Sequence, residues 1–397
     1  MRHLSPSSAG LPRLPGPLPI ALAGLLALLL AMGIGRFAFT ALLPQMRDEG
    51  LLDVASGGLL AASNYLGYLA GALWAAFSRR ADASRRLLVG LLLSVGSTLA
   101  MGLELGFPLW CGVRFLSGVA SAAVYVYATG IVLRSLAACH AAGWSGLHYM
   151  GVGTGIVVSA LLARYMTEAG SALEGWRWLG VVAALGALAV AVVLLPLGRA
   201  DPPVVGEQPA PAGTGEPPMG WLAAAYGLAG FGYIVNATFL PLMLRGQDGT
   251  AGAALDGWLV VGLAALPATL FWVRLSFRWG VYPALISATL IQAVGVALPV
   301  LVNGVAAALA GAALLGATFM GIAGLSQWLA RVPDPRVTAR RIGLITACYG
   351  VGQVFGPLLV ALRGPGGGFA VPVLAASMAL LCSAVLLEVS RRRERLA

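Results

Sequence analysis

Residues 33–46 read GIGRFAFTALLPQM, and residues 230–243 read GFGYIVNATFLPLM. Each stretch lies inside a long apolar segment, and the identical positions share an offset of 197: Gly33, Gly35, Leu43, Pro44 and Met46 match Gly230, Gly232, Leu240, Pro241 and Met243. A Gly-Val-Gly at 151–153 recurs at 350–352, 199 residues later. The chain therefore consists of two related halves. Repeated halves of membrane helices with a site between them are typical of secondary transporters.

The composition indicates a membrane protein. Hydrophobic residues make up 59% of the chain, charged residues only 10%, and the mean hydropathy is +0.87, which leaves too little polar surface for a water-soluble domain. The apolar segments long enough to cross a bilayer are 20–43, 55–77, 87–106, 108–133, 142–165, 177–197, 219–244, 256–274, 279–301, 304–330, 341–362 and 369–388. We expect an all-α integral membrane fold of twelve transmembrane helices in two six-helix bundles.

The regions between these segments predict the domain organisation and the orientation. We expect an N-terminal tail (1–17), a first half (18–197), a Pro-rich linker (198–218), a second half (219–388) and a basic C-terminal tail (389–397). Most arginines fall on the side of the two termini, so the positive-inside rule places both termini in the cytoplasm. That rule also explains the net charge of +10, and no nucleic-acid partner is expected.

Three motifs carry a resemblance to a known family. The first is the Gly-x-Gly-Arg-Phe opening that ends in Leu-Leu-Pro, the second is Asn-Tyr-Leu-Gly-Tyr at 64–68, and the third is Gly-x-Gly-Gln-x-x-Gly-Pro, formed by Gly350, Gly352, Gln353, Gly356 and Pro357. Together they resemble the YbfB/YjiJ-like branch of the major facilitator superfamily. The resemblance implies a multi-pass protein of the bacterial cytoplasmic (inner) membrane that works by alternating access.

The chain also departs from patterns of that superfamily. In the motif that begins at Gly71 and includes Arg79 and Arg80, Ala75 replaces the usual Asp, so the inner gate must be stabilised differently. Arg114 and Gly118 match a pattern whose Arg is linked to proton transfer in exporters. The expected Gly-Pro pair of exporters is missing from the next segment, which has Gly151, Gly153 and Gly155. The resemblance therefore supports antiport only in part.

Arg36 is the most informative polar residue within the predicted spans. It lies about 24 Å along its helix from Ile20, at 1.5 Å per residue, and an Arg at a helix centre costs about 2.5–3.5 kcal/mol on insertion scales. One interpretation is a cavity-facing cation that binds an anionic or carbonyl-bearing substrate through its forked donors. The other is an Arg that snorkels outward or bonds the carbonyls of a broken helix.

His148 and Arg114 are the candidate proton-coupling residues. His148 lies deep in a predicted helix and could titrate near neutral pH, although a hydrogen-bonded packing role is the alternative. For Arg114, the alternative to proton coupling is a structural role in which the side chain caps a helix or snorkels. No Asp or Glu falls in the middle of a predicted span. A cavity with Arg and His but no acid repels cations, which favours an anionic or neutral substrate.

Two further groups complete the predicted site. The polar residues expected to face the cavity and bind a small polar solute are Thr40, Asn64, Tyr68, Tyr125, Tyr149, Tyr233, Asn236, Gln327, Tyr349 and Gln353, in addition to Arg36. The residues expected to serve gating or close helix packing are Gly71, Gly118, Gly151, Gly153, Gly155, Gly350, Gly352, Gly356 and Pro357.

These observations predict a secondary active transporter that moves a small organic solute by alternating access, coupled to protons. We expect a monomer in the lipid bilayer, with no cofactor and no metal. One alternative is efflux by a multidrug/proton antiporter that exports hydrophobic compounds, and a more distant one is a non-transporting membrane sensor on the same fold. An enzyme is not expected, because the chain has no HExxH, GxSxG or paired Asp motif.

Overall fold

The computed structural model describes residues 15–76, 83–199, 217–247, 249–332, 334–364 and 368–396. Arg79, Arg80, most of the predicted tail (1–17) and most of the predicted linker (198–218) lie outside these residues. All regular structure in the described part of the chain is helical. The predicted all-α architecture is therefore confirmed.

The first long helix of the chain is built from three consecutive pieces. These are α1 (Pro17–Leu28), the π-helix η1 (Leu29–Phe37) and α2 (Ala38–Asp48). A π-helix changes the backbone hydrogen-bond pattern and often marks a functional site. The equivalent segment of the second half belongs to a continuous α-helix, so the two halves differ in backbone geometry at this point.

The remaining helices follow in two groups. The first half continues with α3 (Val54–Ala76), α4 (Ala83–Ala100), α5 (Phe107–Ala138), a short 3₁₀ turn η3 (Ala142–Trp144), α6 (Ser145–Ala169) and α7 (Ala172–Arg199). The second half contains α8 (Met219–Arg245), the 3₁₀ turn η4 (Ala251–Ala253), α9 (Ala254–Trp279), α10 (Val281–Leu301), α11 (Val305–Leu329), α12 (Pro335–Leu362) and α13 (Ala370–Leu396). The predicted basic tail is thus helical as far as Leu396.

Eleven helices of the described chain are long and apolar enough to cross a membrane. The twelfth long helix, α3, is not among them, because Asn64, Tyr65 and Tyr68 lower its hydropathy. Several polar residues of the candidate site thus lie together on α3.

Glycine and a capping box define the helix ends. Gly106, Gly280 and Gly304 have φ values of +75°, +89° and +107°, a backbone region that glycine enters without steric cost, and each directly precedes a helix. Asp53 caps α3, because its Oδ1 accepts a hydrogen bond from the Ser56 amide (2.7 Å) while Ser56 Oγ accepts one from the Asp53 amide (2.8 Å). This reciprocal arrangement satisfies amides at the start of the helix.

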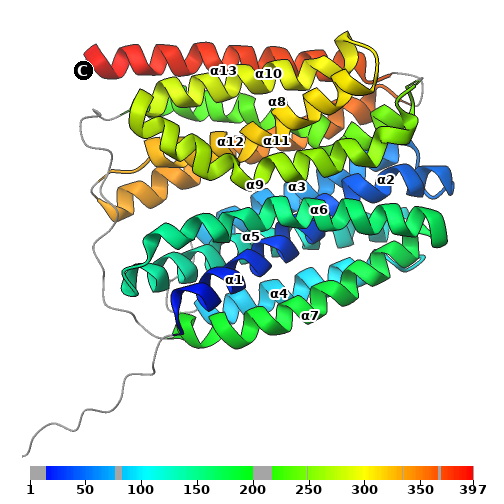
Figure 1. Cartoon of the computed structure of the whole chain (residues 1–397), viewed down its shortest axis with the longest axis horizontal. Helices are drawn as coiled ribbons and strands as arrows, with labels where there is room; N and C mark the ends of the chain where they lie inside the picture. The colour runs from blue at the N-terminus through cyan, green and yellow to red at the C-terminus, as the bar shows by residue number, and fades with distance from the viewer. Residues whose placement is uncertain are drawn as a thin grey trace, which may run out of the picture.

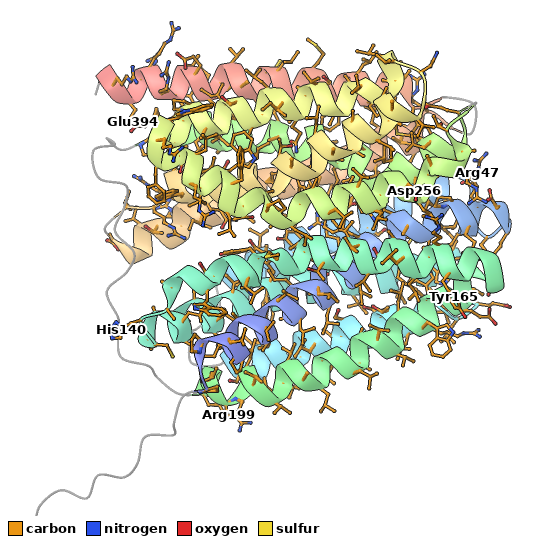
Figure 2. All side chains as sticks on the ribbon, in the orientation of Figure 1. Arg47, His140, Tyr165, Arg199, Asp256 and Glu394 are labelled. Atoms are coloured by element: carbon orange, nitrogen blue, oxygen red, sulfur yellow. The ribbon has the colours of Figure 1, made fainter. Side chains whose placement is uncertain are left out.

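The helices form two six-helix bundles, which Figure 1 shows with α1–α7 below and α8–α13 above. The bundles meet along α3 with α12, α6 with α9, and α2 with α8. The start of α1 and the end of α13 lie at the same end of the molecule (Figure 1), called here the terminal end. The other end, where Figure 2 labels Arg47, Tyr165 and Asp256, is called the opposite end.

Contacts between the bundles follow the internal repeat. Three of them join residues that are 197 apart: Arg36 with Tyr233, Thr40 with Ala237, and Asp48 with Arg245. Equivalent positions can touch only where they face each other across the axis that relates the two halves. The pseudo-twofold axis therefore runs between the first long helix and α8.

The same register extends to α6 and α12, where the Gly-Val-Gly echo has a spacing of 199 residues. Gly153 lies against Leu266 of α9, and Gly350 lies against Leu69 of α3. Both pairs of equivalent positions are 197 apart, and both contacts join the two bundles. The offset in α6 and α12 is therefore also 197, so Gly153 corresponds to Gly350.

Candidate functional site

Arg36 lies at the contact between the two bundles and is only 2% exposed. Its guanidinium carbon lies over the rings of Tyr68 (4.3 Å to the centroid), Tyr65 (4.8 Å) and Phe37 (5.4 Å). Arg36 Nη2 donates a hydrogen bond to the Tyr233 hydroxyl at 3.4 Å. The Nε atom is buried without a partner, and no carboxylate of the described chain forms an ion pair with this guanidinium.

The backbone that holds Arg36 is supported by α5. Three side chains on this helix donate hydrogen bonds to carbonyls of η1: Arg114 to Gly35 (3.1 Å) and Arg36 (3.3 Å), Ser117 to Gly35 (2.7 Å), and Ser121 to Ala31 (2.6 Å). These bonds satisfy carbonyls in a region that water does not reach. Arg114 is 1% exposed, and its contacts fit the structural interpretation of this residue.

The second half contributes an aromatic stack with one amide. Tyr349 stacks on Tyr226 (4.3 Å between centroids) and on Tyr233 (5.6 Å), and Tyr233 stacks on Phe319 at 6.0 Å. The Gln353 amide donates a hydrogen bond to the Tyr233 hydroxyl, and its Oε1 is buried without a partner in the described chain. Tyr233 therefore links the Arg36 guanidinium to the polar face of α12.

The predicted residues nearer the terminal end are partly exposed. Tyr125 of α5, Tyr149 of α6, Gln327 of α11 and Tyr349 of α12 all keep intermediate exposure, whereas Arg36 is buried. The Gln327 side chain bonds the Tyr125 and Tyr226 side chains, which come from different bundles. The exposure of this set indicates that the polar site is more accessible from the terminal end.

Three predicted residues make structural contacts. Asn64 donates to the carbonyl of Arg114 (3.0 Å), and Asn236 donates to the carbonyl of Val296 (3.0 Å), each within its own bundle. Thr40 donates to the carbonyl of Ala237 at 2.7 Å and so joins the bundles. These three side chains stabilise the helices around Arg36 through bonds to the backbone.

His148 lies inside the first bundle. Its Nε2 lies 3.0 Å from Thr129 Oγ1 on α5, its ring packs against Gly24 of α1, and its centroid is 5.0 Å from that of Tyr149. It is fully buried. These surroundings favour the packing interpretation, because a coupling proton must be able to reach the residue from the cavity.

The predicted glycines divide into two groups. Those that pack against a helix of their own bundle are Gly71 and Gly118 (α3 with α5), Gly151 and Gly155 (α6 with the first long helix), and Gly352 and Gly356 (α12 with α8). Gly153 and Gly350 instead face the other bundle. A methyl group added to Gly58 would lie 2.8 Å from the Pro357 carbonyl, so Pro357 also lies at the bundle interface. Only this second group of predicted residues lies at the contact between the two bundles.

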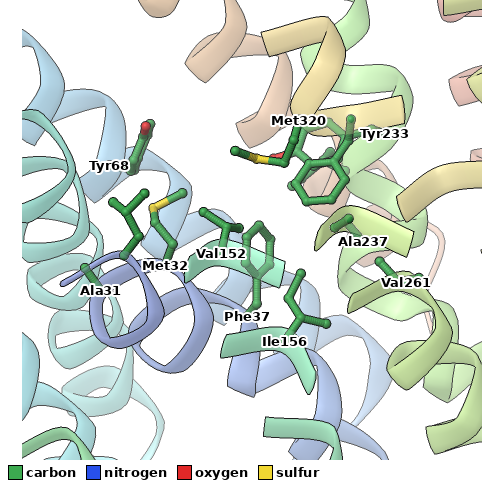
Figure 3. Packing of buried hydrophobic residues seen from close by; sticks show 14 of the residues in the cluster. Ala31, Met32, Phe37, Tyr68, Val152, Ile156, Tyr233, Ala237, Val261 and Met320 are labelled. Carbon is green, nitrogen blue, oxygen red and sulfur yellow. The ribbon is translucent and has the colours of Figure 1, made fainter. Parts of the chain in front are cut away.

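Two ion pairs join the bundles at the opposite end. Arg245 Nη2 lies 2.6 Å from Asp48 Oδ2, and Arg164 Nη1 lies 2.8 Å from Asp256 Oδ1. Between these pairs and Arg36, buried hydrophobic residues from both halves pack together, as Figure 3 shows for Phe37. The opposite end is closed in this conformation.

The described residues include no group of three or more His, Cys, Asp or Glu side chains placed to hold a metal ion. The cysteines of the described chain are free thiols. The chemistry available at the site is therefore that of a guanidinium, phenol hydroxyls and carboxamides.

Comparisons with known proteins agree with this architecture. Residues 28–388 match the model of a family described as "Uncharacterised MFS-type transporter YbfB". The chain belongs to this family. It is thus a multi-pass membrane transporter of the major facilitator superfamily rather than an enzyme, and the predicted resemblance is confirmed.

Among solved structures, the chain is similar to a D-xylose-proton symporter, with a TM-score of 0.67 at 15% identity over 94% of this chain and 96% of the other. No curated protein matches the sequence.

The sequence did not identify four residues that the structure places at the site. Tyr65 lies under the Arg36 guanidinium, Tyr226 stacks on Tyr349, and Trp258 and Phe319 contact Phe37 edge to face. Tyr226 precedes Tyr233 by seven residues, a spacing that repeats one helix face, and this signal could have identified it. Tyr65 belongs to the Asn-Tyr-Leu-Gly-Tyr motif at 64–68, which could also have identified it. Trp258 and Phe319 carry no distinguishing signal, because aromatic residues are common in membrane helices.

Proposed function

We propose that this transporter carries small organic anions, with Arg36 as the residue that binds the negative group. The observation that supports this most is a buried guanidinium at the bundle interface with no carboxylate partner in the described chain. A buried charge is costly unless it is paired and hydrogen-bonded. Aromatic rings and hydrogen bonds to the Tyr233 and Tyr68 hydroxyls compensate it only in part, whereas an anion would pair with it directly.

A second buried cation strengthens the preference for anions. Arg114 lies on the neighbouring helix and bonds the carbonyl of Arg36 itself. Neither guanidinium has an ion-pair partner among the described residues, so the two groups together produce a positive potential in a region of low dielectric. This potential disfavours a cationic substrate. A neutral solute could still use the phenol hydroxyls and the Gln353 amide, so neutral solutes remain the nearest alternative.

We further propose proton coupling, a location in the bacterial inner membrane, and a monomer with both termini in the cytoplasm. The arginine-rich terminal end supports that orientation through the positive-inside rule. The two ion pairs then lie on the outer side, and the polar site opens inward. The similarity in fold to a D-xylose-proton symporter supports proton coupling only by analogy.

Thermal stabilisation of the purified protein tests the substrate class, because a ligand that binds only the folded state raises the melting temperature. The panel is carboxylates, phosphorylated compounds, sugars and hydrophobic cations. We expect carboxylates to stabilise the wild type but not Arg36→Ala, while Arg47→Ala, an exposed arginine on α2, responds like the wild type. Stabilisation by hydrophobic cations alone would refute the proposal and support multidrug efflux.

A further inference from the structure

Gln353 of α12 is a buried carboxamide with one unused oxygen. The residue is 1% exposed, and its Nε2 donates a hydrogen bond to the Tyr233 hydroxyl. Its Oε1 is buried and accepts no hydrogen bond from any described residue. A buried carbonyl oxygen without a donor raises the free energy of the folded protein, so a donor supplied by a ligand would stabilise the site at this point.

The internal repeat shows that helix packing alone does not require an amide here. The position 197 residues before Gln353 is Ile156 of α6, and the position 197 residues before Tyr349 is Val152. Both α6 and α12 join the two bundles, α6 through α9 and α12 through α3. An apolar side chain therefore fills the equivalent place in the first half, and the amide at 353 is a feature of the site rather than of the fold.

The amide lies beside the anion site. Arg36 Nη2 donates to the same Tyr233 hydroxyl at 3.4 Å, and Arg36 Nε has no partner in the described chain. Arg36 and Gln353 thus meet at one phenol, and between them they hold an unused guanidinium donor and an unused amide acceptor. A ligand that satisfies both carries an acidic group and, a few atoms away, a hydrogen-bond donor.

Gln353 lies one helix turn below the part of the site that is exposed at the terminal end. Tyr349 precedes Gln353 by four residues, so the two side chains lie on the same face of α12. Tyr349 is the nearer of the two to the terminal end, where α12 begins (Figure 1), and it keeps intermediate exposure while it stacks on Tyr233 at 5.6 Å. A solute that enters from the terminal end therefore meets Tyr349 first and then the amide.

We propose that Gln353 determines specificity by accepting a hydrogen bond from a hydroxyl group of the substrate, so that the transported anion is a small hydroxy acid. This inference rests on the proposed function and names the substrate class for the same site. The acidic group binds Arg36, and the hydroxyl donates to Gln353 Oε1. The donor is a neutral hydroxyl rather than an ammonium group, because Arg36 and Arg114 have no ion-pair partner among the described residues and repel a cation.

The test measures affinity by calorimetry on the full-length protein in detergent. The ligands are butyrate, the three hydroxybutyrates that carry the hydroxyl on successive carbons, and the matching methoxy compounds, which accept hydrogen bonds but do not donate them. All carry one negative charge, so only the added group differs. We expect at least one hydroxybutyrate to bind about five- to tenfold more tightly than butyrate, and its methoxy counterpart to lose this gain. Arg36→Ala should abolish binding of every member.

Two variants assign the gain to one amide. Gln353→Met removes the amide but keeps the length of the side chain, and it should bring the ratio of hydroxybutyrate to butyrate affinity down to about one. Gln292→Met is the matched control, because it replaces a buried amide of α10 that bonds Thr318, and it should keep the wild-type ratio.

The results separate this inference from the proposed function. Equal affinity for butyrate and every hydroxybutyrate in the wild type would refute the inference, even if Gln353→Met does not fold. A gain that survives Gln353→Met, or that the methoxy compounds retain, would also refute it. In each of these cases, butyrate binding that depends on Arg36 would leave the proposed function intact. No binding of any carboxylate would refute both.

Discussion

Replacement of Arg114 by Met tests how the backbone of the site is held. In the wild type, Arg114 donates to the carbonyls of Gly35 (3.1 Å) and Arg36 (3.3 Å). The Gly35 carbonyl keeps a second donor in Ser117 at 2.7 Å. Among the described residues, no other side chain donates to the Arg36 carbonyl. Arg114→Met therefore removes the side-chain partner of this carbonyl, whereas the Gly35 carbonyl keeps Ser117.

The expected loss of stability follows from these bonds. Hydrogen bonds between membrane helices average about 0.6 kcal/mol and reach about 1.7 kcal/mol, so two of them contribute about 1–3 kcal/mol. Removal of a buried cation offsets part of this loss, because the desolvation of Arg114 and its repulsion from Arg36 disappear. We expect a net destabilisation of about 1–2 kcal/mol, with a displaced Arg36 and weaker anion binding.

Urea unfolding in detergent gives the free energy, and calorimetry gives anion affinity. Arg114→Lys keeps the charge but loses the planar fork, so we expect it to remain close to Arg114→Met in both measurements. Arg47→Met is the matched control, because this exposed side chain should change stability by less than about 0.5 kcal/mol. Wild-type stability and affinity in Arg114→Met would refute the positioning role, and full rescue by Lys would show that charge alone matters.

Three other predictions concern the gate, the coupling and the start of α3. Asp48→Ala should raise the population of molecules with an open opposite end by at most about fivefold, because exposed ion pairs contribute about 0–1 kcal/mol. Spin-label distances across the opposite end measure this population, and Arg245→Ala should raise it equally. His148→Gln should leave the pH dependence of transport in proteoliposomes unchanged, since the contacts of His148 indicate packing. Loss of the pH dependence in this variant would identify His148 as the proton carrier. Asp53→Ala should cost about 0.5–2 kcal/mol of unfolding free energy at pH 7, as for other N-caps. Hydrogen bonds from Ser56 lower the pKa of Asp53, so this contribution should be fully present above the unfolded pKa and be lost as the pH falls through the lower, folded pKa. A difference that stays unchanged after Asp53 is protonated in the folded protein would contradict this.

The fold was predictable because hydrophobicity and repetition determine it. Equal residues at 33–46 and 230–243 revealed the two halves, and apolar segments of spanning length gave the helices. The π-helix η1 was not predictable, because its geometry depends on donors from α5 that are about 80–90 residues away in the sequence. Hydrogen bonds between residues so far apart in the sequence leave no local sequence pattern from which η1 could be predicted.

The candidate site was predictable in its polar part. Arg36, Tyr68, Tyr233 and Gln353 meet in space because charged and amide groups avoid lipid and turn toward the protein interior. The apolar part was not predictable, since nothing local separates a core aromatic residue from one that borders the site, such as Phe319. His148 shows the remaining difficulty: one residue from Tyr149, it turns by about 100° around the helix and faces the inside of its own bundle.

Anion transport through Arg36 is tested most directly by counterflow in proteoliposomes. Vesicles loaded with the unlabelled hydroxybutyrate of highest affinity receive its labelled form outside, and accumulation is compared between wild type, Arg36→Ala, Arg36→Lys and the control Arg47→Ala. We predict rapid counterflow in the wild type and control, none in Arg36→Ala, and a reduced rate in Arg36→Lys, which keeps the charge without the fork. Equal counterflow in wild type and Arg36→Ala would contradict the assignment of Arg36 as the anion site.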